Sequence, residues 1–185
     1  PLVDHEIGKK LSSKYLFTEG AAHQRQALAF SKDYIPAKTQ LAQDLLRLGQ
    51  DEEGWKLAGE AHDADGYDVT TFNLLTLHDT LKKYVTIDRN GFLLRMTRDE
   101  AALYGDEAID LLTEARGLFS KKYDTQIEGS VIVEIFPEKK DFAVRTFGIP
   151  GGDGYMGVCF GRLITANSPK SLVGFQQNWQ SLLWH

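Results

Sequence analysis

An approximate repeat in the first half of the chain is the feature that most constrains its fold. Ile7, Leu41 and Leu75 recur at equal intervals along the sequence. The same interval aligns small residues, namely Gly8 with Ala42, Gly20 with Gly54, and Ala27 with Ala61. Small residues at fixed points of a repeat predict two helices that approach each other closely. A repeating unit of about 34 residues is typical of paired helices that stack on their neighbours.

The middle repeat, residues 37–66, shows the helix pair best. Its first helix carries the large apolar residues Leu41, Leu45, Leu46 and Leu48. We expect a turn at Gly49 and a second helix that ends at Gly66, because glycine is common where helices stop. The apolar residues of this second helix are Trp55, Leu57, Ala58 and Ala61.

Residues 3–83 therefore resemble the tetratricopeptide repeat (TPR) family, as one clear repeat between two degenerate ones. The proline that usually closes a repeat is replaced by Lys32 and Gly66. The resemblance implies stacked antiparallel helix pairs whose inner face can hold a peptide or another domain. A generic helical bundle is an alternative. With fewer than three full repeats, the unit could also serve as a structural collar and not as a peptide receptor.

The residue pattern changes after Tyr84. Residues 85–97 alternate around an Asn90-Gly91 pair, which indicates either two strands joined by a tight turn or one long strand with a bulge. Residues 97–123 have the pattern of a helix. Thr97 and Glu100 fit a capping box at its start, and Gly105 is a candidate for a kink or a break.

Two further strands are expected beyond this helix. Residues 130–137 form a short β-rich run closed by Pro137, and the apolar character of residues 131–135 is typical of a strand buried on both faces. Residues 138–148 predict a short helix that ends at Gly148, followed by a glycine-rich loop. Residues 156–169 are the longest strand candidate, interrupted by Gly157 and Gly161.

The predicted fold class is α+β, with two domains. Residues 1–84 form helical hairpin repeats, and residues 85–185 form a small mixed α/β subdomain with a sheet and flanking helices. Of the residues, 42% are hydrophobic and 25% are charged. These proportions indicate a globular chain.

Charge and composition exclude several function classes. The net charge of −5 and the pI near 5.5 argue against binding to nucleic acid or to an anionic membrane. No apolar run approaches the roughly 18 residues of a membrane span. The one cysteine, Cys159, cannot form an internal disulfide or a zinc knuckle. The cellular compartment stays open.

The final segment, "NWQSLLWH", predicts the start of a helix. Asn178 is a good N-cap, and Trp179, Leu182 and Leu183 form one apolar stripe. No residue typical of a helix end follows before the sequence stops at His185. The first residue is Pro1 and not Met, so we expect the chain to be a piece of a longer protein.

The order of elements over residues 85–185 resembles the front half of a gluzincin-type zinc metallopeptidase domain, of the kind found behind tetratricopeptide repeats in bacterial proteins. The glycine-framed strand "MGVCFGRLITANSP", followed by "NWQSLLWH", carries the resemblance. In that family Trp-His continues into H-E-x-x-H. The resemblance implies that His185 is the first zinc ligand of the parent protein.

The rest of that zinc site is missing from the chain. A glutamate general base, a second histidine and a third ligand would have to follow His185. One imidazole cannot hold a catalytic zinc ion, so we expect no bound cofactor and no peptidase activity in this chain alone. The zinc would belong to the full-length parent.

The resemblance also implies a substrate-binding strand over residues 156–164. In gluzincin-like enzymes an edge strand pairs with the backbone of an extended peptide. Here that strand would contain Val158, Cys159, Phe160 and Gly161. The alternative is an ordinary sheet strand with Cys159 as a small buried hydrophobic residue.

Two functions therefore follow from the sequence. The first is a fragment of a TPR-containing zinc metallopeptidase, whose parent cleaves peptide or protein substrates with a metal-activated water. The second is a TPR module for protein–protein interaction, attached to a catalytically degenerate, metal-free platform. The sequence predicts no nucleic-acid partner and no membrane span for either.

Overall fold

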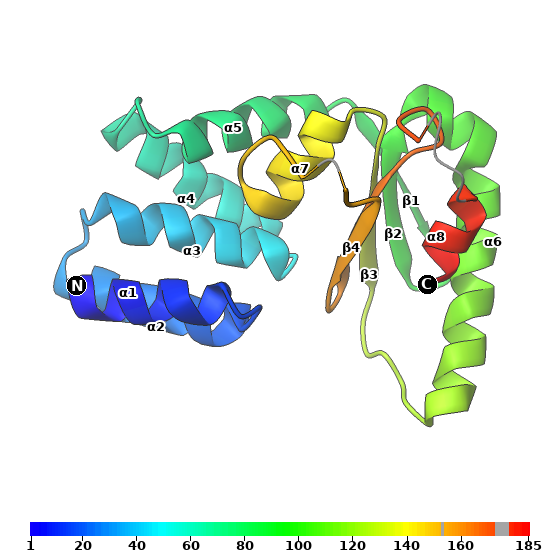
Figure 1. Cartoon of the computed structure of the whole chain (residues 1–185), viewed down its shortest axis with the longest axis horizontal. Coiled ribbons are helices and arrows are strands. Elements are labelled where there is room, and N and C mark those ends of the chain that lie inside the picture. The colour runs from blue at the N-terminus through cyan, green and yellow to red at the C-terminus, as the bar shows by residue number, and fades with distance from the viewer. Residues whose placement is uncertain (153, 173–177) are drawn as a thin grey trace. The chain divides into compact units, whose positions relative to one another are not determined.

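The computed structural model describes residues 1–152, 154–172 and 178–185, and its fold is α+β (Figure 1). The chain divides into two compact units. The first comprises Pro1–Thr80 with Val144–Ile149, and the second comprises Leu81–Ala143 with Pro150–His185. Among the described residues, no helix combines the length and the apolar character that crossing a membrane requires.

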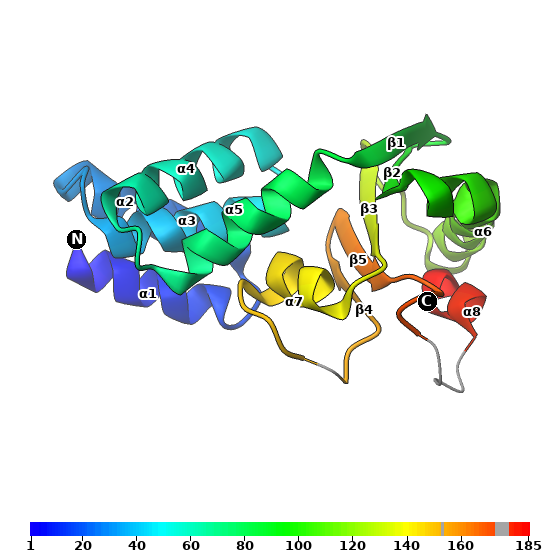
Figure 2. The same cartoon turned by 90° about the horizontal axis from the view of Figure 1, so that it is seen from above.

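The first unit is built from consecutive helices, the first four of which pack as antiparallel neighbours (Figures 1 and 2). These are α1 (Leu2–Ser12), α2 (Phe17–Phe30), α3 (Ile35–Arg47), α4 (Asp51–Ala64) and α5 (Val69–Leu81). Gly49 lies between α3 and α4 with a φ of 73°. Glycine adopts this left-handed conformation without strain. The predicted turn at this position is confirmed.

Small residues lie where the helices of each pair come closest. A Cβ atom on Gly8 would lie 2.8 Å from the carbonyl oxygen of Gly20. In the second pair, a Cβ atom on Gly54 would lie 3.3 Å from the carbonyl oxygen of Ala42. The predicted close approach of the paired helices is therefore confirmed at both places.

The second unit contains a five-stranded sheet in the order β1-β2-β3-β5-β4. Its strands are β1 (Tyr84–Arg89), β2 (Phe92–Thr97), β3 (Val131–Phe136), β4 (Gly157–Phe160) and β5 (Leu163–Asn167). The β2-β3 and β3-β5 pairs are parallel, whereas β1-β2 and β4-β5 are antiparallel. Strand β4 therefore forms one edge of the sheet.

Two helices pack on one face of this sheet, α6 (Arg98–Tyr123) and α8 (Trp179–Trp184) (Figure 1). The core between these layers joins residues from the strands, from α6 and from α8. It contains Phe92, Leu94, Met96, Ala108, Ile109, Leu112, Val131, Val133, Ile135, Ala166, Leu172, Trp179 and Leu183. Strand β3 lies between β2 and β5 and is buried over nearly its whole length, as predicted from its apolar run.

The two alternatives for residues 85–97 are resolved in favour of a strand pair. Asn90 has a φ of 55° and Gly91 a φ of 77°, and together they connect β1 to β2. Positive φ angles at both central residues are the requirement of a type I′ hairpin turn, which Asn-Gly meets best.

The expected break of α6 at Gly105 and the expected cap at Thr97 are both wrong. The helix runs unbroken from Arg98 to Tyr123, so Gly105 does not divide it. Gly105 lies against β1, where a Cβ atom would meet Cδ1 of Ile87 at 2.6 Å. The side chain of Thr97 does not cap the helix backbone either, because its hydroxyl donates to the carboxylate of Glu100 at 3.2 Å.

The expectation of one long strand over residues 156–169 is also wrong. The chain reverses after Phe160, so that β4 and β5 form an antiparallel hairpin. Gly161 has a φ of 63° and begins the two-residue loop. This is the position where a type II′ turn requires glycine. The glycine expected to interrupt a strand is thus the start of a turn.

The helix between β3 and β4 is α7 (Lys139–Phe147). It ends at Gly148, as predicted, with a φ of 84° at that residue. Its last residues, from Val144 onward, belong to the first compact unit.

Candidate functional site

The edge strand β4 presents unpaired backbone groups at two residues. The backbone N–H of Asn167 donates to the carbonyl oxygen of Met156 at 2.8 Å, so this pair is hydrogen bonded across the hairpin. In an antiparallel ladder hydrogen-bonded pairs alternate with non-bonded ones. The backbone groups of Val158 and Phe160 therefore face β5, whereas those of Gly157 and Cys159 point away from it. Within the described part of the chain, no further strand pairs with that side.

The side chains on β4 alternate between the two faces of the sheet. Cys159 lies opposite Ile164, and Gly157 lies opposite Ala166. Directly opposed residues share a face. Since Ile164 and Ala166 pack with the core under α8, Cys159 and the Gly157 position face α8 as well. A Cβ atom on Gly157 would lie 3.1 Å from Cδ1 of Leu182, so glycine at this position leaves room between the strand and the helix.

Helix α8 is held in place by the residues that the sequence indicates. The side-chain oxygen of Asn178 accepts a hydrogen bond from the backbone N–H of Gln180 at 2.8 Å. This is the bond that an N-cap residue makes. Trp179 and Leu183 are buried, and the Trp179 ring packs against Tyr104 at a centroid distance of 5.5 Å. The predicted cap and the predicted apolar stripe are both confirmed.

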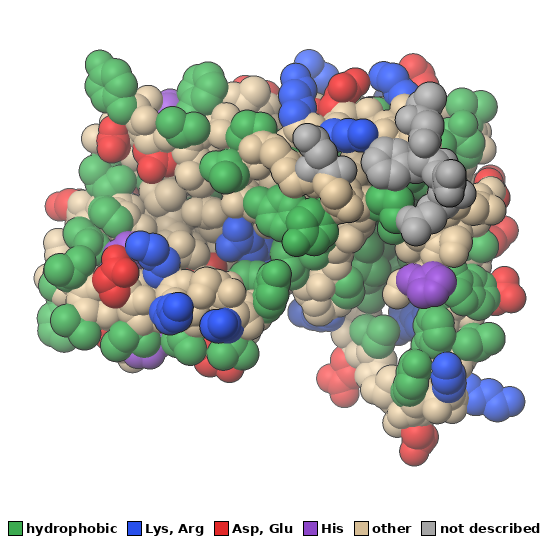
Figure 3. Space-filling view, in the orientation of Figure 1, with side chains coloured by type: hydrophobic (Ala, Val, Ile, Leu, Met, Phe, Trp, Pro, Cys, Tyr) green, Lys and Arg blue, Asp and Glu red, His purple; other side chains and the backbone are tan. Residues whose placement is uncertain are grey.

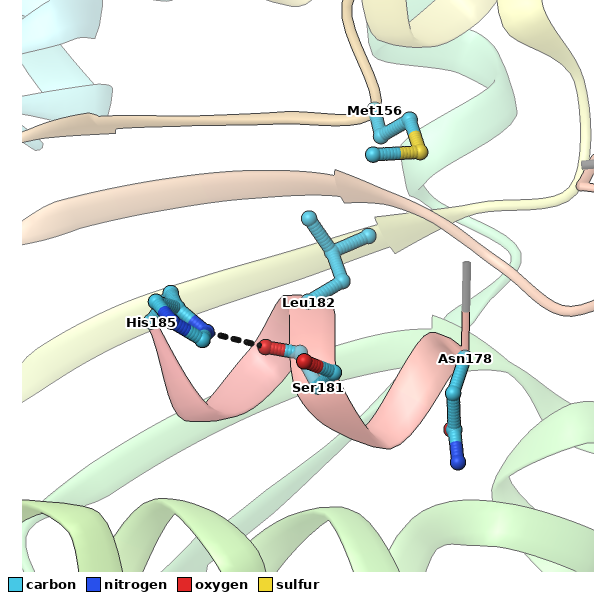
Figure 4. A pocket seen from close by; sticks show the side chains of 5 residues that line it. All are labelled: Met156, Asn178, Ser181, Leu182 and His185. Carbon is cyan, nitrogen blue, oxygen red and sulfur yellow. Dashed lines mark hydrogen bonds between the residues drawn. The ribbon is translucent and has the colours of Figure 1, made fainter. Parts of the chain in front are cut away.

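Two adjoining cavities lie between β4 and α8 and share Leu182 and His185. One, of about 270 Å³, is lined by Gly157, Val158, Cys159, Ile164, Thr165, Ala166, Leu182, Leu183 and His185. The other, of about 290 Å³, is lined by Met156, Asn178, Ser181, Leu182 and His185 (Figure 4). We refer to the two cavities together as the β4–α8 groove. Its walls are mostly aliphatic, and no lysine, arginine, aspartate or glutamate is among these lining residues.

The imidazole of His185 is oriented by its own helix. Its Nδ1 atom lies 2.8 Å from the carbonyl oxygen of Ser181 (Figure 4). A carbonyl oxygen only accepts hydrogen bonds, so Nδ1 must carry the proton that it donates. In the neutral ring Nε2 is then unprotonated and has a lone pair available. Metal-binding histidines are typically oriented by the same kind of hydrogen bond from the other ring nitrogen.

The predicted substrate-binding residues do not all lie together. Val158 and Cys159 line the same cavity as His185. Phe160 and Gly161 do not line it, because the Phe160 side chain points to the opposite face of the sheet and Gly161 lies in the hairpin turn. The alternative of a buried Cys159 is wrong, since this residue is exposed. Partial burial of its thiol nevertheless raises the pKa of Cys159 above its ordinary value.

The described residues do not make a zinc site on their own. The groove contains one imidazole, His185, and one thiol, Cys159. No group of three or more histidine, cysteine, aspartate or glutamate side chains within residues 1–152, 154–172 and 178–185 is arranged to hold a metal ion. A catalytic zinc ion needs three protein ligands, so the described residues supply at most part of such a site.

Met156, Gly157 and Ile164 lie within the strand expected to bind substrate, but the sequence does not single them out as site residues. Met156 and Ile164 line the groove, as does Leu182 of the apolar stripe on α8, and Gly157 contributes an outward-facing backbone amide. One signal was available in the sequence. If Gly161 is taken as a turn, residues 157–160 form a short strand, and the alternation of side chains along a strand places Gly157 and Cys159 on the same face. The contribution of Ser181 is a backbone carbonyl, which no side-chain pattern reveals.

On the face of the molecule in Figure 3, lysine and arginine side chains lie beside acidic ones in several places. This distribution agrees with the negative net charge of the sequence.

The chain was compared with protein family models, curated proteins and solved structures, and none of them matches it.

Proposed function

We propose that the second unit is the peptide-binding part of a zinc-dependent metallopeptidase, and that the helices of the first unit are TPR-type repeats. His185 would be the first zinc ligand, and β4 would hold the substrate backbone. The observation that carries this proposal is the position of a metal-competent imidazole in the same groove as an open sheet edge.

A peptide in extended form fits the chemistry of this edge. The N–H and C=O groups of Gly157 and Cys159 point away from β5, and they can bond to a peptide strand laid beside β4. Peptide binding by strand addition obtains its affinity from such backbone hydrogen bonds and its selectivity from pockets for alternate side chains. The aliphatic walls of the β4–α8 groove favour apolar side chains on the peptide.

The chain's own residues bind and orient in this proposal, and they carry out no hydrolysis. Gly157 and Cys159 fix the peptide backbone, while the hydrogen bond to Ser181 keeps Nε2 of His185 available as a ligand. A zinc ion would supply the activated water for peptide-bond hydrolysis. That chemistry needs two further ligands and a general base, which would have to come from residues that follow His185 in the parent.

The coding sequence beyond the codon for His185 tests the proposal. We expect a glutamate directly after His185, a histidine four positions after it, and a glutamate-bearing helix further on. A chain extended through these residues should bind one zinc ion and cleave an unstructured protein substrate. A stop codon after His185, or a continuation without the glutamate and the second histidine, would remove the catalytic hypothesis and leave the repeat-based interaction module.

A further inference from the structure

The end of α7 is packed into the helical unit through a buried arginine. Residues Val144–Ile149 belong to the first unit, although they lie between two strands of the second unit in the sequence. Arg145 is only 2% exposed, and its side chain is fully buried. A buried guanidinium needs partners for its donors, and this one finds them on α3 and α4.

The contacts of the Arg145 side chain include three groups that we call the arginine seat. Nη1 donates to the carbonyl oxygen of Leu46 at 2.8 Å, near the end of α3. Nη2 donates to Oδ1 of Asp51 at 3.1 Å, in the first turn of α4. The guanidinium carbon lies 5.8 Å from the centre of the Trp55 ring. This distance is within the range of a cation–π contact.

The backbone beyond Arg145 is also bound by the helical unit. The side chain of Arg47 donates from Nε to the carbonyl oxygen of Thr146 at 3.1 Å. Gly148 lies against Gln43 of α3, where a Cβ atom would be 2.6 Å from Oε1 of that side chain. The contacts thus run from Arg145 to Gly148, and they involve the backbone as well as one side chain.

The arginine seat selects for a guanidinium group. Its carbonyl and carboxylate oxygens bind two different nitrogen atoms of one planar fork, while Trp55 offers an aromatic ring within cation–π range. A lysine ammonium is a single point of charge and does not match this fork geometry. The same surface would therefore recognise an arginine on another segment, provided that Arg145 had left.

We propose that the helical unit is a receptor for an arginine-bearing segment, and that in this chain the receptor is occupied internally by residues 144–149. An external arginine peptide must then compete with Arg145. This inference does not depend on the proposed peptidase function, because it involves only residues of the first unit.

Peptide binding to the full chain tests the inference. The probe is a short end-blocked peptide with one central arginine, and the variant is Arg145→Ala, which empties the side-chain part of the seat while residues 146–148 stay in place. We expect the variant to bind the peptide at least tenfold more tightly than the wild-type chain does. We also expect at least tenfold weaker binding of a matched peptide in which the arginine is lysine. Equal binding to both chains, or no binding to a folded variant, would overturn the inference.

A second measurement covers the case that Arg145→Ala does not fold. Trypsin cleaves after arginine, and the bond between Arg145 and Thr146 is protected while the seat is occupied. Asp51→Ala should increase the rate of cleavage at this bond at least tenfold. Glu52→Ala, an exposed residue in the same turn of α4, should leave the rate unchanged. Equal cleavage rates in the two variants would contradict the proposed seat.

Discussion

His185 donates a hydrogen bond from Nδ1 to the carbonyl oxygen of Ser181, one helical turn earlier, at 2.8 Å. This single contact determines which ring nitrogen can bind a metal. It also holds the imidazole at the groove between α8 and the edge strand β4. The link between His185 and the groove is therefore a local property of α8, independent of any metal.

The tautomer of His185 is the first prediction. Since Ser181 offers only an acceptor, the neutral imidazole should carry its proton on Nδ1, with Nε2 unprotonated. Nitrogen-15 NMR of the histidine side chains, recorded with the imidazole in its neutral form, distinguishes the two tautomers. A His185 ring protonated on Nε2 would show that the hydrogen bond to Ser181 is absent in solution.

The stability of the helical unit should depend on the charge of Asp44. This carboxyl is fully buried and accepts hydrogen bonds from Ser12 at 2.8 Å and from Gln40 at 2.9 Å. Burial raises the pKa of Asp44 from 3.8 to about 6, although these hydrogen bonds and Arg47 oppose the rise. The value of 3.8 applies to the unfolded chain and the value of about 6 to the folded chain. Between these two pH values Asp44 is therefore mostly protonated in the folded state and mostly ionised in the unfolded state.

The sign of the effect follows from proton linkage. Because the folded state binds the extra proton, the Asp44 contribution is fully present below about pH 4. As the pH rises through 6 this contribution is lost, and the free energy of unfolding falls by up to about 3 kcal/mol. Asp44→Asn has no titratable group here. Urea unfolding at pH 4, 5 and 6 should therefore show the stability of the variant rising relative to the wild type. An unchanging difference between the two would contradict the raised pKa.

Two glycines of α4 provide a matched test of close helix packing. A Cβ atom on Gly54 would lie 2.8 Å from two carbon atoms of Leu46, whereas one on Gly59 would have no neighbour within 4 Å. Alanine favours the helix by about 1 kcal/mol over glycine at either position, but overpacking costs about 1–3 kcal/mol at Gly54. Gly54→Ala should thus be less stable than Gly59→Ala by about 2 kcal/mol.

Urea unfolding measures this difference directly. Gly59→Ala should be at least as stable as the wild type, since it changes only the helix propensity. If both variants had the same free energy of unfolding, the helices of the second pair would not be in close contact at Gly54.

Local patterns predict the elements of the fold well where one residue type decides the conformation. Asn90-Gly91 supports the left-handed angles of a hairpin turn, Gly148 ends α7, and Asn178 caps α8. The role of Gly161 is not evident from the sequence, because a glycine within an apolar run fits both an interrupted strand and a turn. Only the pairing of β4 with β5 distinguishes these possibilities.

Contacts between distant parts of the sequence are not predictable in this way. Arg145 lies 99 residues from Leu46, whose carbonyl oxygen it binds, and no pattern along the chain links the two. The packing of Gly105 against Ile87 and the shared cavity of Cys159 and His185 are of the same kind. Each depends on tertiary packing that overrides local propensity.

The most direct test of the peptide groove is an NMR titration of the chain with an extended, end-blocked peptide of alternating leucine and threonine. The largest amide shifts should occur at Gly157 and Cys159, with a change in the His185 ring. Cys159→Pro is the control, because it removes an N–H group that points away from β5, and proline is tolerated at such edge positions. The account predicts that this variant stays folded and loses most of the peptide affinity. Shifts that avoid β4, or unchanged affinity in folded Cys159→Pro, would contradict it.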